Sequence, residues 1–178
     1  MFEDSAVESM WLKAHRKHLT PQLKGELRRF GIDLDRPLKP QYENEVLHQG
    51  TRMLRRTVYG HIVDDAAAYR AIGEAVIDGF FDTVIGKAMA NVFKLIGFRK
   101  IVERLPQTLQ RGNNHVKATI RWTGQNEAVL EVNDTQPHPA INVGVFERAF
   151  RHWFKVPGFK AELLESSPQK TAYRLSWP

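Results

Sequence analysis

Cysteine is missing from this sequence of 178 residues. Its absence excludes disulfide bonds, thiolate metal sites and a cysteine nucleophile, and it is typical of proteins kept in a reducing compartment. The N-terminal residues, Met1 to Asp4, are acidic in character and lack the basic-then-apolar order of a signal peptide. The most apolar stretch, residues 75–98, is interrupted by charged side chains and does not predict a membrane span. We therefore expect a cytoplasmic protein without a transmembrane segment.

Catalytic and cofactor motifs are also missing. The sequence has no glycine-rich phosphate motif, no HExxH helix and no Cys/His zinc spacing. His15 and His18 share a helix face, but two ligands without a neighbouring carboxylate rarely hold a metal. Asp78 and Asp82 lie one helical turn apart and could act as paired carboxylates, although exposure or pairing with Arg or Lys explains them better. The sequence therefore predicts neither an enzyme nor a metal site, and it leaves any cofactor unknown.

The net charge of +6 comes from one part of the chain. Residues 83–121 carry eight basic side chains and only Glu103 as an acid; the basic ones are Lys87, Lys94, Arg99, Lys100, Arg104, Arg111, Lys117 and Arg121. Such a segment can attract nucleic acid, phosphate or an acidic partner, but it is more often a solvated face. We favour the solvated face, and a nucleic-acid partner is not expected.

Helical signals dominate the first hundred or so residues. Thr20 is a good N-cap for a helix that Gly31 ends, a second helix is expected over residues 43–57, and Asp64 is a good cap for a third. From Tyr69 to Ile96 the apolar side chains follow helical spacing, which predicts one long core helix or two helices meeting at Gly86.

Three glycines recur within this apolar stretch, at Gly73, Gly79 and Gly86. Each costs up to about 1 kcal/mol relative to alanine inside a helix. Their recurrence near one face indicates a neighbouring backbone that packs closely or the wall of a pocket.

Period-two alternation replaces helical spacing after Leu105 and Pro106. Residues 116–122 and 128–132 predict one hairpin, a helix follows over about 141–155, and residues 159–163 and 171–177 predict a second hairpin. The expected fold class is α+β, with N-terminal helices packed on a C-terminal antiparallel sheet of order β-β-α-β-β. We expect a single domain over residues 1–178, helical to about 110 and β-β-α-β-β from about 111.

The polar run at residues 111–115 lies between the core helix and the first strand. Arg111 could offer its planar fork to an anion, and Asn113 and Asn114 could supply amide donors and acceptors. Alternatively, the run is a glycine-containing turn whose asparagines bond the local backbone, and this is the interpretation we favour.

Three segments together resemble a paralogous myxobacterial family of uncharacterised proteins of about 180–200 residues: residues 31–38, residues 79–86, and residues 105–114. The order of elements is also remotely similar in architecture to haem-nitric-oxide sensor domains, vinyl-reductase-type domains and TRAPP small subunits. That resemblance implies a pocket between helices and sheet for a small, largely apolar ligand. The cysteines that carry zinc or an acyl chain in some of those relatives are absent here, and we find no convincing match to the haem sensor's ligand motif. The resemblance therefore does not carry haem, zinc or acylation of cysteine over to this chain.

The leading functional hypothesis is a non-enzymatic sensor or regulatory domain that binds a small, largely apolar or amphipathic ligand. One alternative is a protein-interaction adaptor or homodimer without a ligand, and another is nucleic-acid binding through residues 83–121. The candidate ligand-binding residues are apolar walls and polar contacts: Phe80, Phe81, Val84, Ile85, Met89 and Trp122, with Arg111, Asn113 and Asn114.

Overall fold

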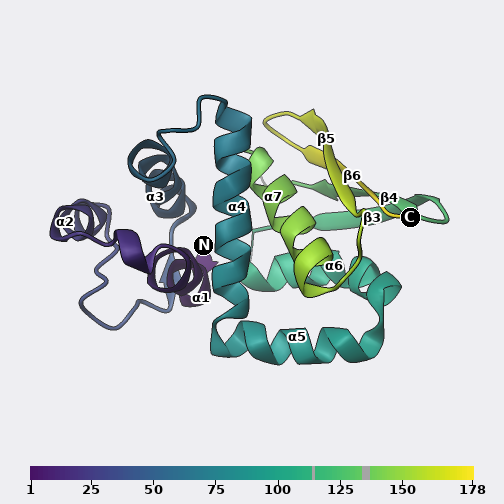
Figure 1. Cartoon of the computed structure of the whole chain (residues 1–178), viewed down its shortest axis with the longest axis horizontal. Coiled ribbons are helices and arrows are strands. Elements are labelled where there is room, and N and C mark those ends of the chain that lie inside the picture. The colour runs from purple at the N-terminus through teal and green to yellow at the C-terminus, as the bar shows by residue number, and fades with distance from the viewer. Residues whose placement is uncertain (114, 134–136) are drawn as a thin grey trace.

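The computed structural model describes residues 1–113, 115–133 and 137–178, apart from the side chains of Lys94, Arg111 and Gly112. Figure 1 shows a group of helices on one side of helix α4 and a sheet with its covering helices on the other. The elements before α4 are β1 (Phe2–Glu3), α1 (Asp4–Val7), the π-helix η1 (Glu8–Ala14), the 3-10 helix η2 (Arg16–His18), α2 (Pro21–Arg29), β2 (Gln41–Tyr42) and α3 (Asn44–Thr57).

The expected helix caps are confirmed in this part of the chain. The Thr20 hydroxyl accepts a hydrogen bond from the Leu23 amide at 3.2 Å, and the Asp64 carboxylate accepts one from the Ala67 amide at 2.6 Å. Gly31 follows the end of α2 with a φ of 94°, a conformation that glycine adopts without strain. These helices enclose the N-terminal core, a cluster of buried side chains that includes Trp11, Leu27, Ile32, Leu54 and Ile72.

The predicted long core helix is two helices. Helix α4 (Asp65–Phe81) ends at Asp82, and α5 (Val84–Ile96) begins after Thr83, whose hydroxyl accepts from the Gly86 amide at 3.0 Å. The expected junction at Gly86 is therefore three residues too late, because a threonine N-cap sets the start of the second helix. Gly86 itself is buried in the first turn of α5, against the carbonyl of Phe80.

A further helix follows α5, within the stretch expected to be helical to about residue 110 but without predicted bounds of its own. Gly97, with a φ of 78°, separates α5 from α6 (Phe98–Gly112), and α6 continues through Pro106. A proline inside a helix removes one backbone hydrogen bond and costs about 3 kcal/mol. Burial of Ile101, Val102 and Leu105 against the sheet offsets that cost, so tertiary packing overrides the local signal.

The C-terminal part has the predicted β-β-α-β-β order. Its elements are β3 (Ala118–Gly124), β4 (Glu127–Val132), α7 (Ala140–Arg148), the π-helix η3 (Ala149–Trp153), β5 (Lys160–Ser166) and β6 (Thr171–Ser176). The four strands form one antiparallel sheet of order β3-β4-β6-β5, in which Leu130 pairs with both Ile120 and Tyr173. The α+β fold class is confirmed.

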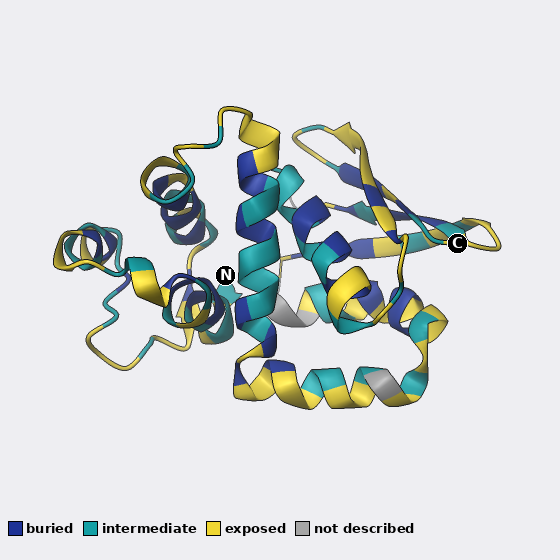
Figure 2. Cartoon of the chain, viewed as in Figure 1, coloured by how far each residue is buried: buried dark blue, intermediate teal, exposed yellow. Residues whose placement is uncertain are grey.

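Helices α6 and α7 share the C-terminal core with the sheet. Phe146 of α7 and Phe150 of η3 pack with Val102 of α6 and with Leu130 and Tyr173 of the strands. Figure 2 shows buried residues concentrated on the inner surfaces of α4, α7 and the strands, whereas α5 has few. No helix of the described residues is long and apolar enough to cross a membrane.

Helix α4 contacts neighbours on both sides through its glycines. A Cβ at Gly73 would overlap with the carbonyl of Ile141, and one at Gly144 of α7 would overlap with the carbonyl of Arg70 on α4. A Cβ at Gly79 would overlap with the carbonyl of Ser9 in η1. The predicted close approach of neighbouring backbones is confirmed at Gly73 and Gly79.

Candidate functional site

A groove lies between α5 and α6, beside the C-terminal end of α4. Its volume is about 820 Å³, which is sufficient for a ligand of moderate size. The side chains that line it come from these three helices: Phe80, Ile85, Ala88, Met89, Val92, Phe93, Glu103, Arg104, Gln107 and Thr108. The groove is outside the C-terminal core, because α6 presents its buried face to the sheet and its opposite face to α5. A pocket between helices and sheet was expected, and the groove is formed by helices alone.

One wall of the groove is the apolar side of α5. Ile85 and Val92 line the groove and are still 51% and 50% exposed, and Phe93 is held by an edge-to-face contact with Phe154 at 5.3 Å. A helix of 13 residues is only marginally stable on its own in water. Its apolar side chains are largely uncovered by the rest of the described chain, which makes α5 a wall that a ligand or a partner would stabilise.

The other wall is polar. Arg104 is exposed and has no acidic partner among the residues that the structure describes, while the neighbouring Glu103 pairs with Arg99 at 3.7 Å. Gln107 and Thr108 add an amide and a hydroxyl, and the Thr108 hydroxyl donates to the Arg104 carbonyl at 3.0 Å. An apolar wall opposite an unpaired guanidinium fits an amphipathic molecule better than a purely apolar one.

The predicted apolar site residues divide between groove, core and surface. Phe80, Ile85 and Met89 line the groove together. Phe81 does not, because it is 3% exposed and stacks on Trp153 with ring centroids 4.6 Å apart. Val84 also lies outside the lining and is 85% exposed on the surface of α5. Phe81 and Val84 thus lie apart from the wall that Phe80, Ile85 and Met89 share, since adjacent helical residues point about 100° apart. A role in ligand binding stays a prediction for all five side chains.

Trp122, on strand β3, is away from the groove. Its ring packs edge to face against Trp177 at 5.7 Å, and the Arg99 guanidinium lies 4.4 Å from its ring centroid. This geometry is typical of a cation–π contact. Trp122 therefore supports the junction of the sheet with α6 rather than the groove.

The predicted polar contacts lie near the end of α6. Arg111 and Gly112 are the last residues of α6, so the favoured turn over residues 111–115 is wrong for these two, while the bond from Asn113 to the local backbone that it predicted is present. The side chain of Arg111 and the whole of Asn114 lie outside the described part of the structure. Asn113 forms an isolated bridge with Phe2 and is buried, and its side-chain oxygen accepts from the His115 amide at 3.1 Å. Asn113 is not among the groove residues.

The acidic residues considered as paired carboxylates have different surroundings. Asp78 binds Arg148 through both of its oxygens, at 2.9 and 3.0 Å from the Arg148 Nε, and also accepts from the Trp153 indole at 2.9 Å. The hydrogen bonds with Asp78 raise the pKa of Arg148. Asp82 is exposed. The interpretation that these carboxylates pair with a cation or face solvent is confirmed.

Glu147 of α7 is a buried acid that sequence reasoning missed. Its carboxylate is bound by Arg70 of α4 and by Arg151 at 2.9 Å, and it accepts from the backbone amide of Ala161 on β5 at 3.2 Å. It thus joins α4, α7 and the sheet. The available sequence signal was one glutamate on an otherwise apolar helix face, because Glu147 follows Gly144 by three residues and Val143 by four.

His15 is the histidine with the most enclosed ring among the described side chains. Its Nδ1 lies 2.6 Å from the Met10 carbonyl, and its Nε2 lies 3.0 Å from the Tyr59 hydroxyl. Burial lowers the pKa of His15 below its ordinary value of 6.5. Within the described residues, no group of three or more His, Cys, Asp or Glu could hold a metal ion.

Solved structures with the same arrangement belong to the H-NOX class. An oxygen-binding H-NOX domain related to soluble guanylate cyclases aligns with a TM-score of 0.69 at 10% identity, over 98% of this chain and 92% of that one. A structure from work on heme distortion in the H-NOX family gives 0.68 at 13% identity, over 97% and 93%. A variant H-NOX of T. Tengcongensis gives 0.60 at 10% identity, over 87% and 86%. The chain has an H-NOX-like fold, and the expected likeness to haem-nitric-oxide sensor domains is confirmed at the level of the fold.

The chain belongs to a protein family described as a protein of unknown function, DUF2378, whose model matches residues 1–178. Among curated proteins, no match is found. A myxobacterial source stays a prediction.

Proposed function

We propose that this chain is a non-enzymatic sensor or regulatory domain that binds a small amphipathic ligand in the groove between α5 and α6. The observation that carries the proposal is the groove itself, with an apolar wall on α5 and the unpaired Arg104 on α6. The ligand's apolar part would lie against Ile85, Met89 and Val92, and an acidic head group would lie near Arg104. A reducing compartment such as the cytoplasm suits a chain without cysteine.

The fold supports this proposal indirectly. Domains with the same arrangement include one described as oxygen-binding and others described by their heme. Identity near 10% allows the fold to be carried over but not the ligand. The ligand therefore has to be argued from this chain's own side chains.

Heme does not fit the donor set of the groove. The side chains that line it include no histidine, cysteine or tyrosine, and Met89 is its one soft donor. His15 lies in a different part of the fold, in contact with Met10 and Tyr59 through its two ring nitrogens. We therefore propose a ligand without iron that is held by apolar contact and by the cation.

The surroundings of the acidic residues support a role without catalysis. Asp78 is bound by Arg148 and Trp153, which leaves it poorly placed to exchange a proton with a ligand. The groove places Glu103 and Arg104 next to each other, without a nucleophile and base in contact.

The test is native mass spectrometry of freshly purified protein, compared with its denatured mass. We expect an extra mass of a few hundred daltons, or, when the groove is empty, uptake of palmitate added in solution. Met89→Glu places a charge on the apolar wall and should abolish either adduct. Val63→Glu is the matched control, because Val63 is 97% exposed in the loop between α3 and α4.

Two results would contradict the proposal. One is a wild-type protein that carries no extra mass and takes up no palmitate. The other is an adduct that Met89→Glu retains, with circular dichroism showing that the variant is folded. Either result would favour the alternative of an adaptor without a ligand.

A further inference from the structure

The outer face of α5 is an apolar surface that the described protein leaves uncovered. Val84 is 85% exposed and Leu95 is 87% exposed, and Ala88 between them is exposed as well. Val84 and Leu95 are not among the residues that line the groove, whereas Ala88 is exposed and also lines it, so Ala88 lies at the border between the outer face and the groove. We define Val84, Ala88 and Leu95 as the outer face of α5.

The outer face forms a continuous stripe. At about 100° per residue, Val84, Leu95 and Ala88 fall within an arc of about 40°, and Val92 and Ile85 extend it to about 100° on the side of the groove. Lys87 and Asn91 lie at the other edge of the stripe and are exposed. An apolar stripe with a basic edge is the pattern of a helix that lies in a membrane interface.

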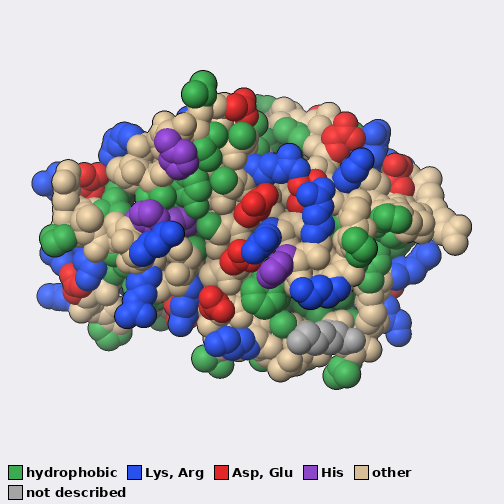
Figure 3. All heavy atoms as spheres, in the orientation of Figure 1, with side chains coloured by type: hydrophobic (Ala, Val, Ile, Leu, Met, Phe, Trp, Pro, Cys, Tyr) green, Lys and Arg blue, Asp and Glu red, His purple; other side chains and the backbone are tan. Residues whose placement is uncertain are grey.

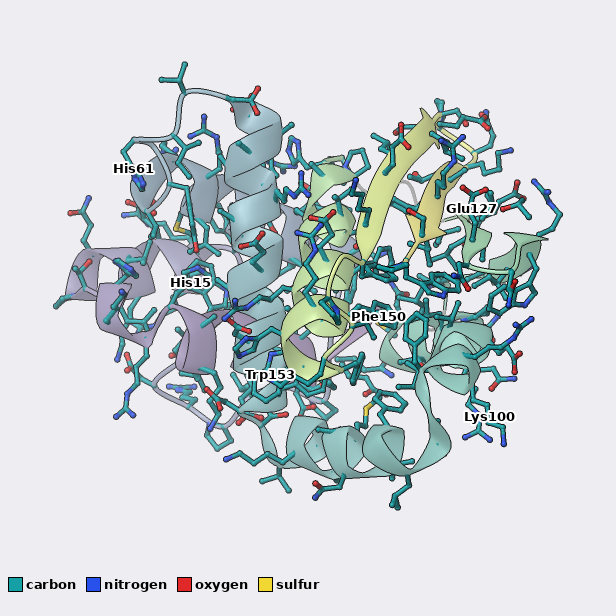
Figure 4. All side chains as sticks on the ribbon, turned by 45° about the vertical axis from the view of Figure 1, so that its right-hand side comes forward. His15, His61, Lys100, Glu127, Phe150 and Trp153 are labelled. Carbon is teal, nitrogen blue, oxygen red and sulfur yellow. The ribbon has the colours of Figure 1, made fainter. Side chains whose placement is uncertain are left out.

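Basic side chains surround this stripe. Lys87 of α5 and Lys100 and Arg104 of α6 are exposed and have no acidic partner among the residues that the structure describes. Figure 4 shows Lys100 extending away from the body of the molecule near α5. Figure 3 shows hydrophobic and basic side chains side by side along the edge of the molecule that α5 forms. The surface is therefore apolar and positively charged at once.

The position of α5 allows a flat surface to reach it. Figure 1 shows α5 along one edge of the molecule, with its axis roughly parallel to that edge and no element beyond it. We propose that the outer face of α5 docks this domain onto an anionic membrane surface, with α5 parallel to the bilayer and the lysines in the head-group region.

A second copy of the chain is a poorer partner for this face. A helix of 13 residues is about 20 Å long, and one stripe of it is much smaller than the roughly 800 Å² per partner of a stable protein interface. Two copies would also bring Lys87 and its basic neighbours together, which opposes association. An anionic lipid surface has the complementary charge and needs only shallow insertion of the apolar side chains.

The experiment is co-sedimentation of the full chain with phosphatidylcholine vesicles and with phosphatidylcholine/phosphatidylglycerol vesicles. The wild-type protein should sediment with the anionic vesicles only, and raising the salt should weaken binding. Leu95→Glu and Val84→Glu should each reduce binding at least tenfold, and Lys87→Glu should reduce it severalfold. Val63→Glu makes the same chemical change at an exposed site distant in the chain and should bind like the wild type.

The results that would overturn the proposal are equally specific. One is a wild-type protein that stays in solution with anionic vesicles. The other is that the Leu95→Glu and Val84→Glu variants still sediment with them. Light scattering that shows a dimer lost in Leu95→Glu, without vesicle binding by the wild type, would assign the face to a second copy. Because both residues are almost fully exposed, the variants should remain folded by circular dichroism. The proposal does not rest on the ligand groove, since Met89→Glu and Leu95→Glu separate ligand uptake from vesicle binding.

Discussion

Phe81 connects the end of α4 to the π-helix η3, and its truncation should be among the most damaging single changes in the chain. The ring is 3% exposed, stacks on Trp153 at 4.6 Å and meets Phe154 edge to face at 5.7 Å. Loss of a buried phenylalanine costs about 3–5 kcal/mol from lost burial and the cavity that remains. With Phe80, which meets Phe81 edge to face at 5.4 Å, these make three aromatic contacts, each worth about 0.5–1.5 kcal/mol beyond burial, and they place Phe81→Ala in the upper half of that range.

The neighbouring Phe80 supplies a matched comparison. It is only partly buried and lines the open groove, so Phe80→Ala removes less apolar contact and leaves no enclosed cavity. We expect a loss of about 1–1.5 kcal/mol for this change. The two variants differ by one position in sequence and by the surface on which the ring lies.

Urea denaturation, followed by circular dichroism and tryptophan fluorescence, measures both free energies of unfolding. The emission of folded Phe81→Ala should also shift to longer wavelength, because Trp153 loses the ring that stacks on it. A loss below about 1 kcal/mol for Phe81→Ala, or equal losses for the two variants, would refute the placement of Phe81 in the core.

Three further predictions concern helix packing, pH and nucleic acid. Gly73→Ala should destabilise the fold by more than about 1 kcal/mol, because its Cβ would overlap with the Ile141 carbonyl. Gly25→Ala should instead stabilise the fold by up to about 1 kcal/mol, because no atom lies within 4 Å of its added Cβ. Chemical denaturation measures both changes. Because burial lowers the pKa of His15 below 6.5, the unfolded chain binds more protons than the folded chain just below that pH. The free energy of unfolding should therefore rise with pH up to about 6.5 and then level off. In urea titrations between about pH 5 and 7, His15→Gln should flatten this rise. Duplex DNA should not bind at physiological salt through residues 83–121, and a tight, salt-sensitive complex in fluorescence anisotropy would contradict this.

Local signals predicted most of the fold. The caps at Thr20 and Asp64 and the alternation in residues 116–132 lie within short stretches, and each is sufficient to fix the element beside it. The β-β-α-β-β order followed from the same alternation. The bounds of α6 do not follow from the local pattern, because Pro106 is typical of a helix boundary, whereas the apolar spacing of Ile101, Leu105 and Leu109 continues past it.

The candidate site was harder to predict for a related reason. Four of the ten residues that line the groove belong to α6, and without that helix the position of Arg104 could not be predicted. The direction in which the Phe81 side chain points depends on where α4 ends and α5 begins, and the N-cap at Thr83 sets that position. Contacts between distant residues, such as Glu147 with Arg70, leave no local pattern in the sequence and require the packed structure.

The π-helices η1 and η3 lie against the same end of α4. Ser9 and Ala14 of η1 approach Gly79, and Trp153 of η3 covers Phe81. In a π-helix each backbone hydrogen bond spans five residues instead of four, so the segment holds one residue more than an α-helix would. Removing a single residue from η1 or η3 should return that segment to α-helical geometry and change the contacts that it makes with the end of α4. Insertions and deletions are more easily accommodated in the loop between α3 and α4, around the exposed Val63.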